Sequence, residues 1–140
     1  HHSQYIDELI NEKKIVPKPY LDEDITFHDP CYLGRHNGEY DAPRKVLQSV
    51  LKEGRIKEME QSKSDSFCCG AGGGNMWYEI KTGERINQNR VNQAVGTEAK
   101  TIAAACNFCN IMLEDGVKTT GNEENIRVVD IAEMVSKGLE

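Results

Sequence analysis

Five cysteines define the chemistry that this chain could perform. They form one single residue, one adjacent pair and one C-x2-C pair, with 36 residues in each of the two intervals. The five are Cys31, Cys68, Cys69, Cys106 and Cys109. Thiolates bind zinc, copper(I) and iron–sulfur clusters. Adjacent cysteines point to opposite sides of an extended backbone, and five ligands exceed the four of tetrahedral zinc. The pattern therefore favours a multinuclear iron–sulfur site.

A glycine-rich run follows the adjacent cysteines directly, in the order Cys-Cys-Gly-Ala-Gly-Gly-Gly. Glycine tolerates positive φ and lets the backbone approach a bound group closely. The N–H groups of such a run could hydrogen-bond to sulfide. We therefore expect a cofactor-binding loop that includes Gly70, Gly72, Gly73 and Gly74. A phosphate loop is disfavoured, because the run lacks the G-x-x-x-x-G-K-[ST] pattern and contains no basic residue.

Two other uses of the cysteines stay open. A structural zinc module could employ three or four of them for partner binding. A metal-free dithiol protein could form a disulfide between Cys106 and Cys109, although no cis-proline context typical of thioredoxin is evident. The odd number of cysteines argues against a secreted disulfide framework. A reducing, cytoplasmic compartment is therefore expected.

Composition limits the class of partner. The 140 residues are enough for one domain with a real core. The net charge of −6 disfavours nucleic acid and anionic membranes as primary partners. No apolar run approaches the roughly 20 residues of a membrane span, so no direct membrane insertion is expected. The chain begins at His1 without a methionine, and we expect it to be a piece of a longer protein.

Predicted helices and strands alternate along the chain. We expect strands over residues 25–28, 56–59, 101–105 and 126–129. We expect helices over residues 1–16, 43–54, 82–100, 110–117 and 130–139. This alternation predicts an α/β fold with a mostly parallel sheet flanked by helices. Ligands bind beyond the carboxyl ends of strands in such sheets. Because Cys31 and Cys106 occupy such positions, we expect the cysteines to converge at that edge.

Several residues near the cysteines have two interpretations. His28 could donate to a cluster sulfur, or it could be a structural residue at a strand end. Arg35 and Arg90 could stabilise an anionic cluster, or they could lie at the edge of the core. Asp29 is expected to cap the turn at Pro30.

Other features are predicted to be structural. Met76 and Trp77 are expected to pack rather than to carry electrons. The acidic residues 22–24 and the pair at 123–124 are expected to be solvated surface. Residues 57–66 are expected to be polar and partly exposed.

The motifs together resemble the CCG-type cysteine-rich domain. This family is found in the B-type and D-type subunits of heterodisulfide reductase and in the iron–sulfur subunits of glycolate, lactate and glycerol-3-phosphate oxidation. The resemblance covers roughly residues 24–135. The matching stretches are residues 28–35, 68–74 and 106–109. The subgroup looks like the iron–sulfur oxidoreductases associated with electron-transfer flavoprotein, on the residues Met76, Trp77, Arg85, Asn87 and Arg90.

The resemblance implies a cofactor and a domain organisation. The five cysteines would hold a non-cubane 4Fe–4S cluster, with zinc as the alternative that some copies carry. Residues 21–140 would form a C-terminal CCG domain, preceded by a linker or helix at residues 1–20. A first CCG domain and a ferredoxin-like segment would lie elsewhere in the same polypeptide.

The resemblance also implies a function. The domain would relay electrons between a flavoprotein, or a thiol/disulfide substrate, and a quinone-type acceptor. Electron-transfer flavoprotein and quinone are the implied external partners. This piece is not expected to be active alone, and the missing part could hold it at the cytoplasmic face of the membrane. Handled in air without a cluster, its thiols are expected to pair as a disulfide.

Overall fold

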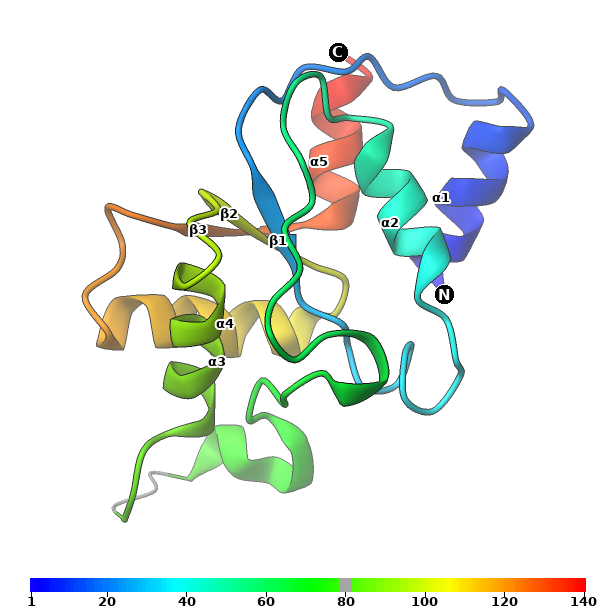
Figure 1. Cartoon of the computed structure of the whole chain (residues 1–140). Coiled ribbons are helices and arrows are strands. Elements are labelled where there is room, and N and C mark those ends of the chain that lie inside the picture. The colour runs from blue at the N-terminus through cyan, green and yellow to red at the C-terminus, as the bar shows by residue number, and fades with distance from the viewer. Residues whose placement is uncertain (79–81) are drawn as a thin grey trace.

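The computed structural model describes residues 1–78 and 82–140 of the chain. Strands and helices alternate within these ranges (Figure 1), which confirms the predicted α/β fold. The strands are β1 (Ile25–Phe27), β2 (Thr101–Ala104) and β3 (Arg127–Asp130). The α-helices are α1 (His2–Asn11), α2 (Asp41–Gln48), α3 (Ile86–Val95), α4 (Asn107–Thr119) and α5 (Ile131–Gly138). Two 3-10 segments are η1 (Lys63–Asp65) and η2 (Gly72–Trp77).

The three strands form a parallel sheet in the order β1-β2-β3. Ile25 pairs with Thr101, and Thr101 pairs in turn with Arg127. The central strand β2 is buried along its whole length, as expected for a parallel strand covered on both faces. Because all three strands run in the same direction, their carboxyl ends meet at one edge of the sheet.

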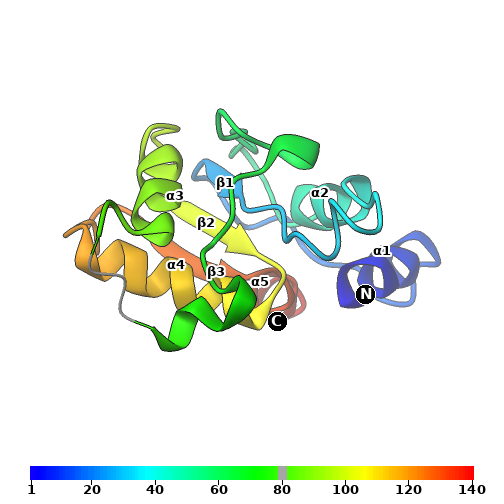
Figure 2. The ribbon, with the colours of Figure 1, turned by 90° about the horizontal axis from the view of Figure 1, so that it is seen from below.

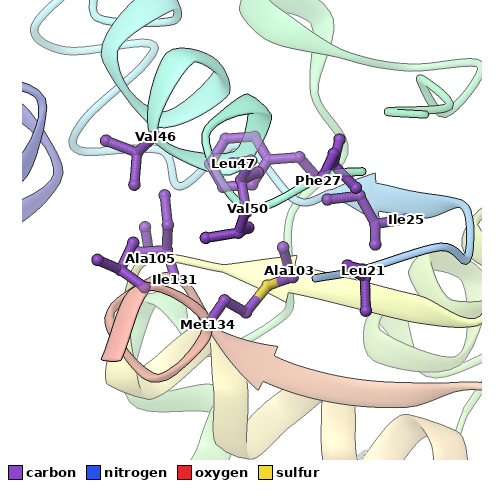
Figure 3. Packing of buried hydrophobic residues seen from close by; sticks show 12 residues of the cluster. Leu21, Ile25, Phe27, Val46, Leu47, Val50, Ala103, Ala105, Ile131 and Met134 are labelled. Atoms are coloured by element: carbon purple, nitrogen blue, oxygen red, sulfur yellow. The ribbon is translucent and has the colours of Figure 1, made fainter. Parts of the chain in front are cut away.

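Helices cover both faces of the sheet. Figures 1 and 2 show α1, α2 and α5 on one side and α3 and α4 on the other. The first side encloses an apolar core that joins β1 and β2 to α2 and α5 (Figure 3). Its buried members are Leu21, Ile25, Phe27, Val46, Leu47, Val50, Leu51, Ala103, Ala105, Ile131, Met134 and Val135.

A second core lies on the opposite face of the sheet. It joins Ile102 and Ala104 of β2 to Val91 of α3 and Leu113 of α4. The alternation of Ile102 and Ala104 with Ala103 between the two cores follows the period of two of a strand. This second core also contains Cys69 and Cys109, so the candidate site is built into the packing of α3 and α4.

The segment at residues 1–20 packs on the first core. Ile6 and Ile10 of α1 contact it, and Ser3 is fully buried. The Tyr20 hydroxyl donates to the Met134 carbonyl oxygen at 3.2 Å, and the Lys18 N–H donates to the Gly138 carbonyl oxygen at 2.7 Å. The division of the chain at residue 20 stays a prediction.

Several predicted boundaries were wrong. The helix predicted at 82–100 is shorter, because it ends at Val95 with Gly96 as its C-cap. The strand predicted at 56–59 is only an isolated bridge between Ile25 and Ile56. Residues 57–66 are partly exposed as predicted, with Met59 and Ser66 buried.

The acidic residues 22–24 are also more than solvated surface. The Thr101 hydroxyl donates to the Glu23 carboxylate at 2.8 Å, and Arg127 forms an ion pair with the same group. Glu23 therefore helps to join the amino ends of β2 and β3 to the segment that precedes β1.

No helix in the described ranges is long and apolar enough to cross a membrane.

Candidate metal centre

All five cysteines line one cavity of about 310 Å³. The cavity lies at the carboxyl edge of the sheet, where β1 leads to Cys31 and β2 leads to Cys106. This confirms the predicted convergence of cysteines from distant parts of the sequence. All five are free thiols in the structure. The disulfide expected for metal-free protein handled in air stays a prediction.

Cys31 is positioned by the turn that follows β1. The Gly34 N–H donates to the Pro30 carbonyl oxygen at 2.9 Å, and the His36 N–H donates to the Cys31 carbonyl oxygen at 3.1 Å. Asp29 was predicted to cap this turn, and that prediction was wrong.

The Asp29 carboxylate instead binds two groups from elsewhere in the chain. It accepts two hydrogen bonds from the Arg44 guanidinium, at 2.8 and 2.9 Å, and one from the Lys63 N–H at 2.8 Å. Burial opposes the charge of Arg44, but its hydrogen bonds to Glu58 and Asp29 raise the pKa of its guanidinium. Asp29 thus ties the turn that holds Cys31 to α2 and to η1.

Cys68 and Cys69 lie in the loop between η1 and η2. Gly70 has a φ of +92°, and its N–H donates to the Cys68 sulfur at 3.2 Å. The Arg35 guanidinium anchors the start of the loop by donating to the Ser66 carbonyl oxygen at 2.6 Å. Arg35 therefore binds the loop backbone.

The four glycines of the predicted loop have different positions. Gly72 and Gly74 line the cavity with the cysteines. Gly73 and Gly74 have φ values of +66° and +77°, which place them in the left-handed region. Gly70 is not among the residues lining the cavity, but it reaches the site through its N–H.

Cys106 and Cys109 occupy the start of α4. Cys106 is the N-cap, in an extended conformation, and Cys109 lies in the first turn. The Cys109 thiol and the backbone N–H groups of Cys109 and Phe108 lower the pKa of Cys106 to about 6. A helix N-terminus stabilises a thiolate in this way.

The pKa values of Cys68, Cys69 and Cys109 depend on one another. Hydrogen bonds from Cys109, Cys68 and His28 hold the pKa of Cys69 well below its ordinary value. The hydrogen bond to Cys69 raises the pKa of Cys68, and those to Cys106 and Cys69 raise the pKa of Cys109. The site therefore concentrates negative charge on Cys69 and Cys106.

Two buried basic residues lie behind the cysteines. His28 and Arg90 are 1% and 0% exposed, and the Arg90 Nε–H donates to His28 Nδ1 at 3.0 Å. Ligand atoms of His28, Cys69 and Cys109 lie within 4.8 Å of one another. Burial lowers the pKa of His28, against the opposing effect of its hydrogen bond to Cys69.

Sequence reasoning identified His28 and Arg90 but missed their neighbours. Arg90 also donates to the Gln61 carbonyl oxygen at 2.8 Å, to Gln93 Oε1 at 2.6 Å and to Ser66 Oγ at 3.1 Å. The spacing of Gln93 three residues after Arg90 on one helix was a usable signal. No local pattern marks Gln61 or Ser66.

Aromatic side chains surround the mouth of the cavity. Tyr32, Trp77 and Phe108 line it and are 76%, 79% and 57% exposed, respectively. The predicted packing of Trp77 was wrong, because its side chain is exposed beside the cavity. Met76, in the same segment η2, packs against the second core as predicted.

The geometry and the motifs can be compared with known proteins. A family model described as a cysteine-rich domain, CCG, matches residues 25–114. The chain belongs to the CCG family.

The CCG domain is similar to parts of several larger proteins. It is 41% identical over 99% of its length to a probable iron–sulfur-binding oxidoreductase, FadF, of Bacillus subtilis, and 42% identical over its whole length to EtfAB:quinone oxidoreductase of Syntrophomonas wolfei. It is 38% identical over 99% of its length to the D-type subunit of dihydromethanophenazine:CoB--CoM heterodisulfide reductase of Methanosarcina barkeri. It covers 20%, 20% and 33% of these proteins, respectively. No solved structure matches it.

Proposed function

We propose that this CCG domain binds an iron–sulfur cluster and carries electrons within a larger oxidoreductase. One observation supports this most strongly: the five cysteines of the chain line a single cavity. Thiolate is the ligand of iron–sulfur clusters, and the five sulfurs exceed what one tetrahedral metal ion takes. The names of the relatives point to the same class of protein.

The residues present fit such a cluster. Cys31, Cys68, Cys69, Cys106 and Cys109 are the proposed ligands, and the non-cubane 4Fe–4S type is proposed from the resemblance to the CCG family. When bound, the cluster supplies one-electron transfer. Gly72 and Gly74 line the cavity without side chains, which leaves room beside the sulfurs. The Gly70 N–H donates to the Cys68 sulfur and so favours its thiolate.

The proposed role is an electron relay between a flavoprotein, or a thiol/disulfide substrate, and a quinone-type acceptor. The names of the Syntrophomonas and Methanosarcina relatives support these two alternatives. The chain covers between one fifth and one third of these relatives, so the first CCG domain and a ferredoxin-like segment are proposed partners in the same polypeptide. We propose a cytoplasmic site, held at the membrane by the remainder of the protein, because five cysteines do not suit a secreted disulfide framework and one relative is named a probable membrane-anchored ferredoxin.

Elemental analysis tests the proposal. The chain is purified or reconstituted without oxygen, and iron, acid-labile sulfide and zinc are measured per chain. We expect iron and sulfide in equal amounts, and the loss of both in a Cys68→Ser, Cys69→Ser double variant. A Ser62→Ala variant is the control, because its side chain lies outside the cysteine cavity. Protein that takes up neither iron nor sulfide refutes the proposal.

A structural zinc site is the second candidate. The close approach of the buried Cys69 and Cys109 sulfurs favours it, because thiolate is a zinc ligand. One zinc per chain without iron or sulfide would select this alternative. A third alternative, a metal-free dithiol, is favoured by the low pKa of Cys106 at a helix N-terminus. It predicts a reversible Cys106–Cys109 disulfide in protein free of both metals.

A further inference from the structure

Arg90 is a buried cation with an unusual set of partners. Its side chain is fully buried, and four of its hydrogen bonds go to uncharged acceptors on His28, Gln61, Gln93 and Ser66. Within residues 1–78 and 82–140, it forms no ion pair with a carboxylate. Burial lowers the pKa of Arg90 to about 10, which still leaves it charged at neutral pH. A buried charge needs compensation, and the Asp29 carboxylate and the Cys69 sulfur supply negative charge nearby.

The contact between Arg90 and His28 determines where the imidazole proton lies. The Nε–H of arginine can only donate a hydrogen bond. It lies 3.0 Å from His28 Nδ1, so Nδ1 must be the accepting nitrogen of a neutral ring. The proton of the neutral ring is then on Nε2.

The same contact removes both nitrogens from metal binding. The lone pair of Nδ1 is used by Arg90, and Nε2 carries the proton. A neutral histidine ligand needs one nitrogen with a free lone pair. A ligand atom of His28 lies within 4.8 Å of the Cys69 sulfur, and only Nε2 is left to donate toward it. The buried group of His28, Cys69 and Cys109 is therefore a hydrogen-bonded arrangement.

We propose that Arg90 holds His28 in the tautomer protonated on Nε2, so that His28 donates a hydrogen bond to the Cys69 sulfur and is not a metal ligand. Arg90 and His28 are positioning residues in this proposal. Ser66, Gln61 and Gln93 fix the guanidinium by accepting three of its other N–H groups. Because Gln61 and Ser66 both precede the adjacent cysteines in the chain, Arg90 orients the start of this loop together with the imidazole.

The first experiment requires no metal. Long-range ¹H–¹⁵N NMR spectra are recorded on reduced, metal-free chain labelled at histidine, and the His28 signals are assigned with a His28→Gln variant. We expect a proton on Nε2 and none on Nδ1. A proton on Nδ1, in the neutral or the doubly protonated ring, overturns the proposal. This result decides the tautomer even if the chain binds no cluster.

Two arginine variants test the cause of the tautomer. Arg90→Met removes every donor from this side chain, so the two His28 tautomers should become mixed. Arg127→Met is the matched control, since Arg127 is exposed on β3, and it should leave the His28 signals unchanged. An Arg90→Met variant that is folded and retains the single Nε2–H tautomer would show that Arg90 does not set it.

The second experiment rests on the proposed cluster. N–H···S hydrogen bonds to ligand sulfurs tune the reduction potential, and they favour the more negative, reduced state. His28→Leu should lower the equilibrium constant for reduction about tenfold, which is about 59 mV for one electron. His28→Gln should restore most of this loss, because its amide N–H can reach the same sulfur. Equal potentials for wild type and His28→Leu, or metal loss in both His28 variants, would contradict the proposal.

Discussion

At the scale of single residues, the fold makes the Cys106 thiol more acidic than an ordinary cysteine. Its position as N-cap of α4 and the neighbouring Cys109 thiol lower its pKa to about 6. In metal-free protein, the rate of alkylation of Cys106 should therefore rise with a midpoint near pH 6. Peptide mass spectrometry after timed iodoacetamide treatment measures this rate. Cys109→Ala should move the midpoint upward, whereas Cys31→Ala should not, because Cys31 is not a cause of the shift.

The same shift affects stability with a defined sign. A folded-state pKa below the ordinary thiol value stabilises the folded state at alkaline pH. This contribution is fully present above about pH 9, and it is lost as the pH falls toward 6. Urea denaturation of Cys106→Ser should lack this part of the pH dependence.

Gly70 is the glycine whose replacement should be most damaging in the cysteine loop. Its φ of +92° is disfavoured for other residues, and a Cβ there would lie 3.2 Å from Ile86 Cβ. Gly70→Ala should destabilise the metal-free protein by about 1–2 kcal/mol from the backbone alone. Gly72→Ala is the matched control, because no atom lies within 4 Å of its Cβ position. Equal urea midpoints for the two variants would show that the loop can relax without cost.

At the scale of elements, α3 and α4 depend on a close approach at Gly116. A Cβ there would lie 2.8 Å from Val91 Cγ2 and 2.9 Å from the Asn87 carbonyl oxygen. Gly116→Ala should therefore separate the helices and cost about 1–3 kcal/mol. Because α4 begins with Cys106 and Cys109, the variant should also bind less iron.

A second helix glycine provides the control. Gly96 is the C-cap of α3 with a φ of −60°, and its Cβ position meets only ordinary contacts at 3.4 Å and beyond. Gly96→Ala should stabilise the protein by about 0.4–1 kcal/mol, because it restricts the unfolded chain. Thermal denaturation of both variants compares the two effects. A destabilised Gly96→Ala variant would contradict the assigned geometry.

The sequence predicted the type and order of most elements, but not all of their ends. β2 is recognisable because a short apolar run leads into Cys106. The end of α3 at Val95 depends on the turn at Gly96 and on contacts with α4, which no local pattern contains. The strand predicted at residues 56–59 fails because Ile56 makes only one bridge, to Ile25.

The candidate site was more predictable than its surroundings. Spacing and strand position were enough to place Cys31 and Cys106 at one edge of the sheet. The sequence could not predict the partners of Arg90 or the pairing of Asp29 with Arg44. These contacts join distant segments that only tertiary packing brings together. Met76 and Trp77 are neighbours in the sequence, yet Met76 packs on the second core and Trp77 is exposed, and no local pattern separates the two.

At the scale of the whole molecule, the site joins structures on both faces of the sheet. Cys69 and Cys109 belong to the core under α3 and α4, whereas the turn at Cys31 is tied to α2 through Asp29. Any ligand that binds only the folded state stabilises it, by about 2.7 kcal/mol at one hundred times its dissociation constant. The iron-loaded chain should therefore melt at a higher temperature than metal-free chain under anaerobic conditions.

A variant without the central sulfurs serves as the comparison. The Cys68→Ser, Cys69→Ser protein should melt at the same temperature with or without iron and sulfide. Identical melting temperatures for loaded and metal-free wild type would mean that the bound metal is not coupled to folding.

The equal intervals between the cysteines have a further consequence for the polymer. A cluster bound to Cys31, to the adjacent pair and to the C-x2-C pair would cross-link the chain at three points and close two loops of 36 intervening residues. A covalent cross-link that closes a loop of this length lowers the conformational entropy of the unfolded chain, which raises its free energy by about 4 kcal/mol. A cluster that persists on unfolding would thus leave the chain in two tethered loops, and refolding would begin with its distant strand ends already together.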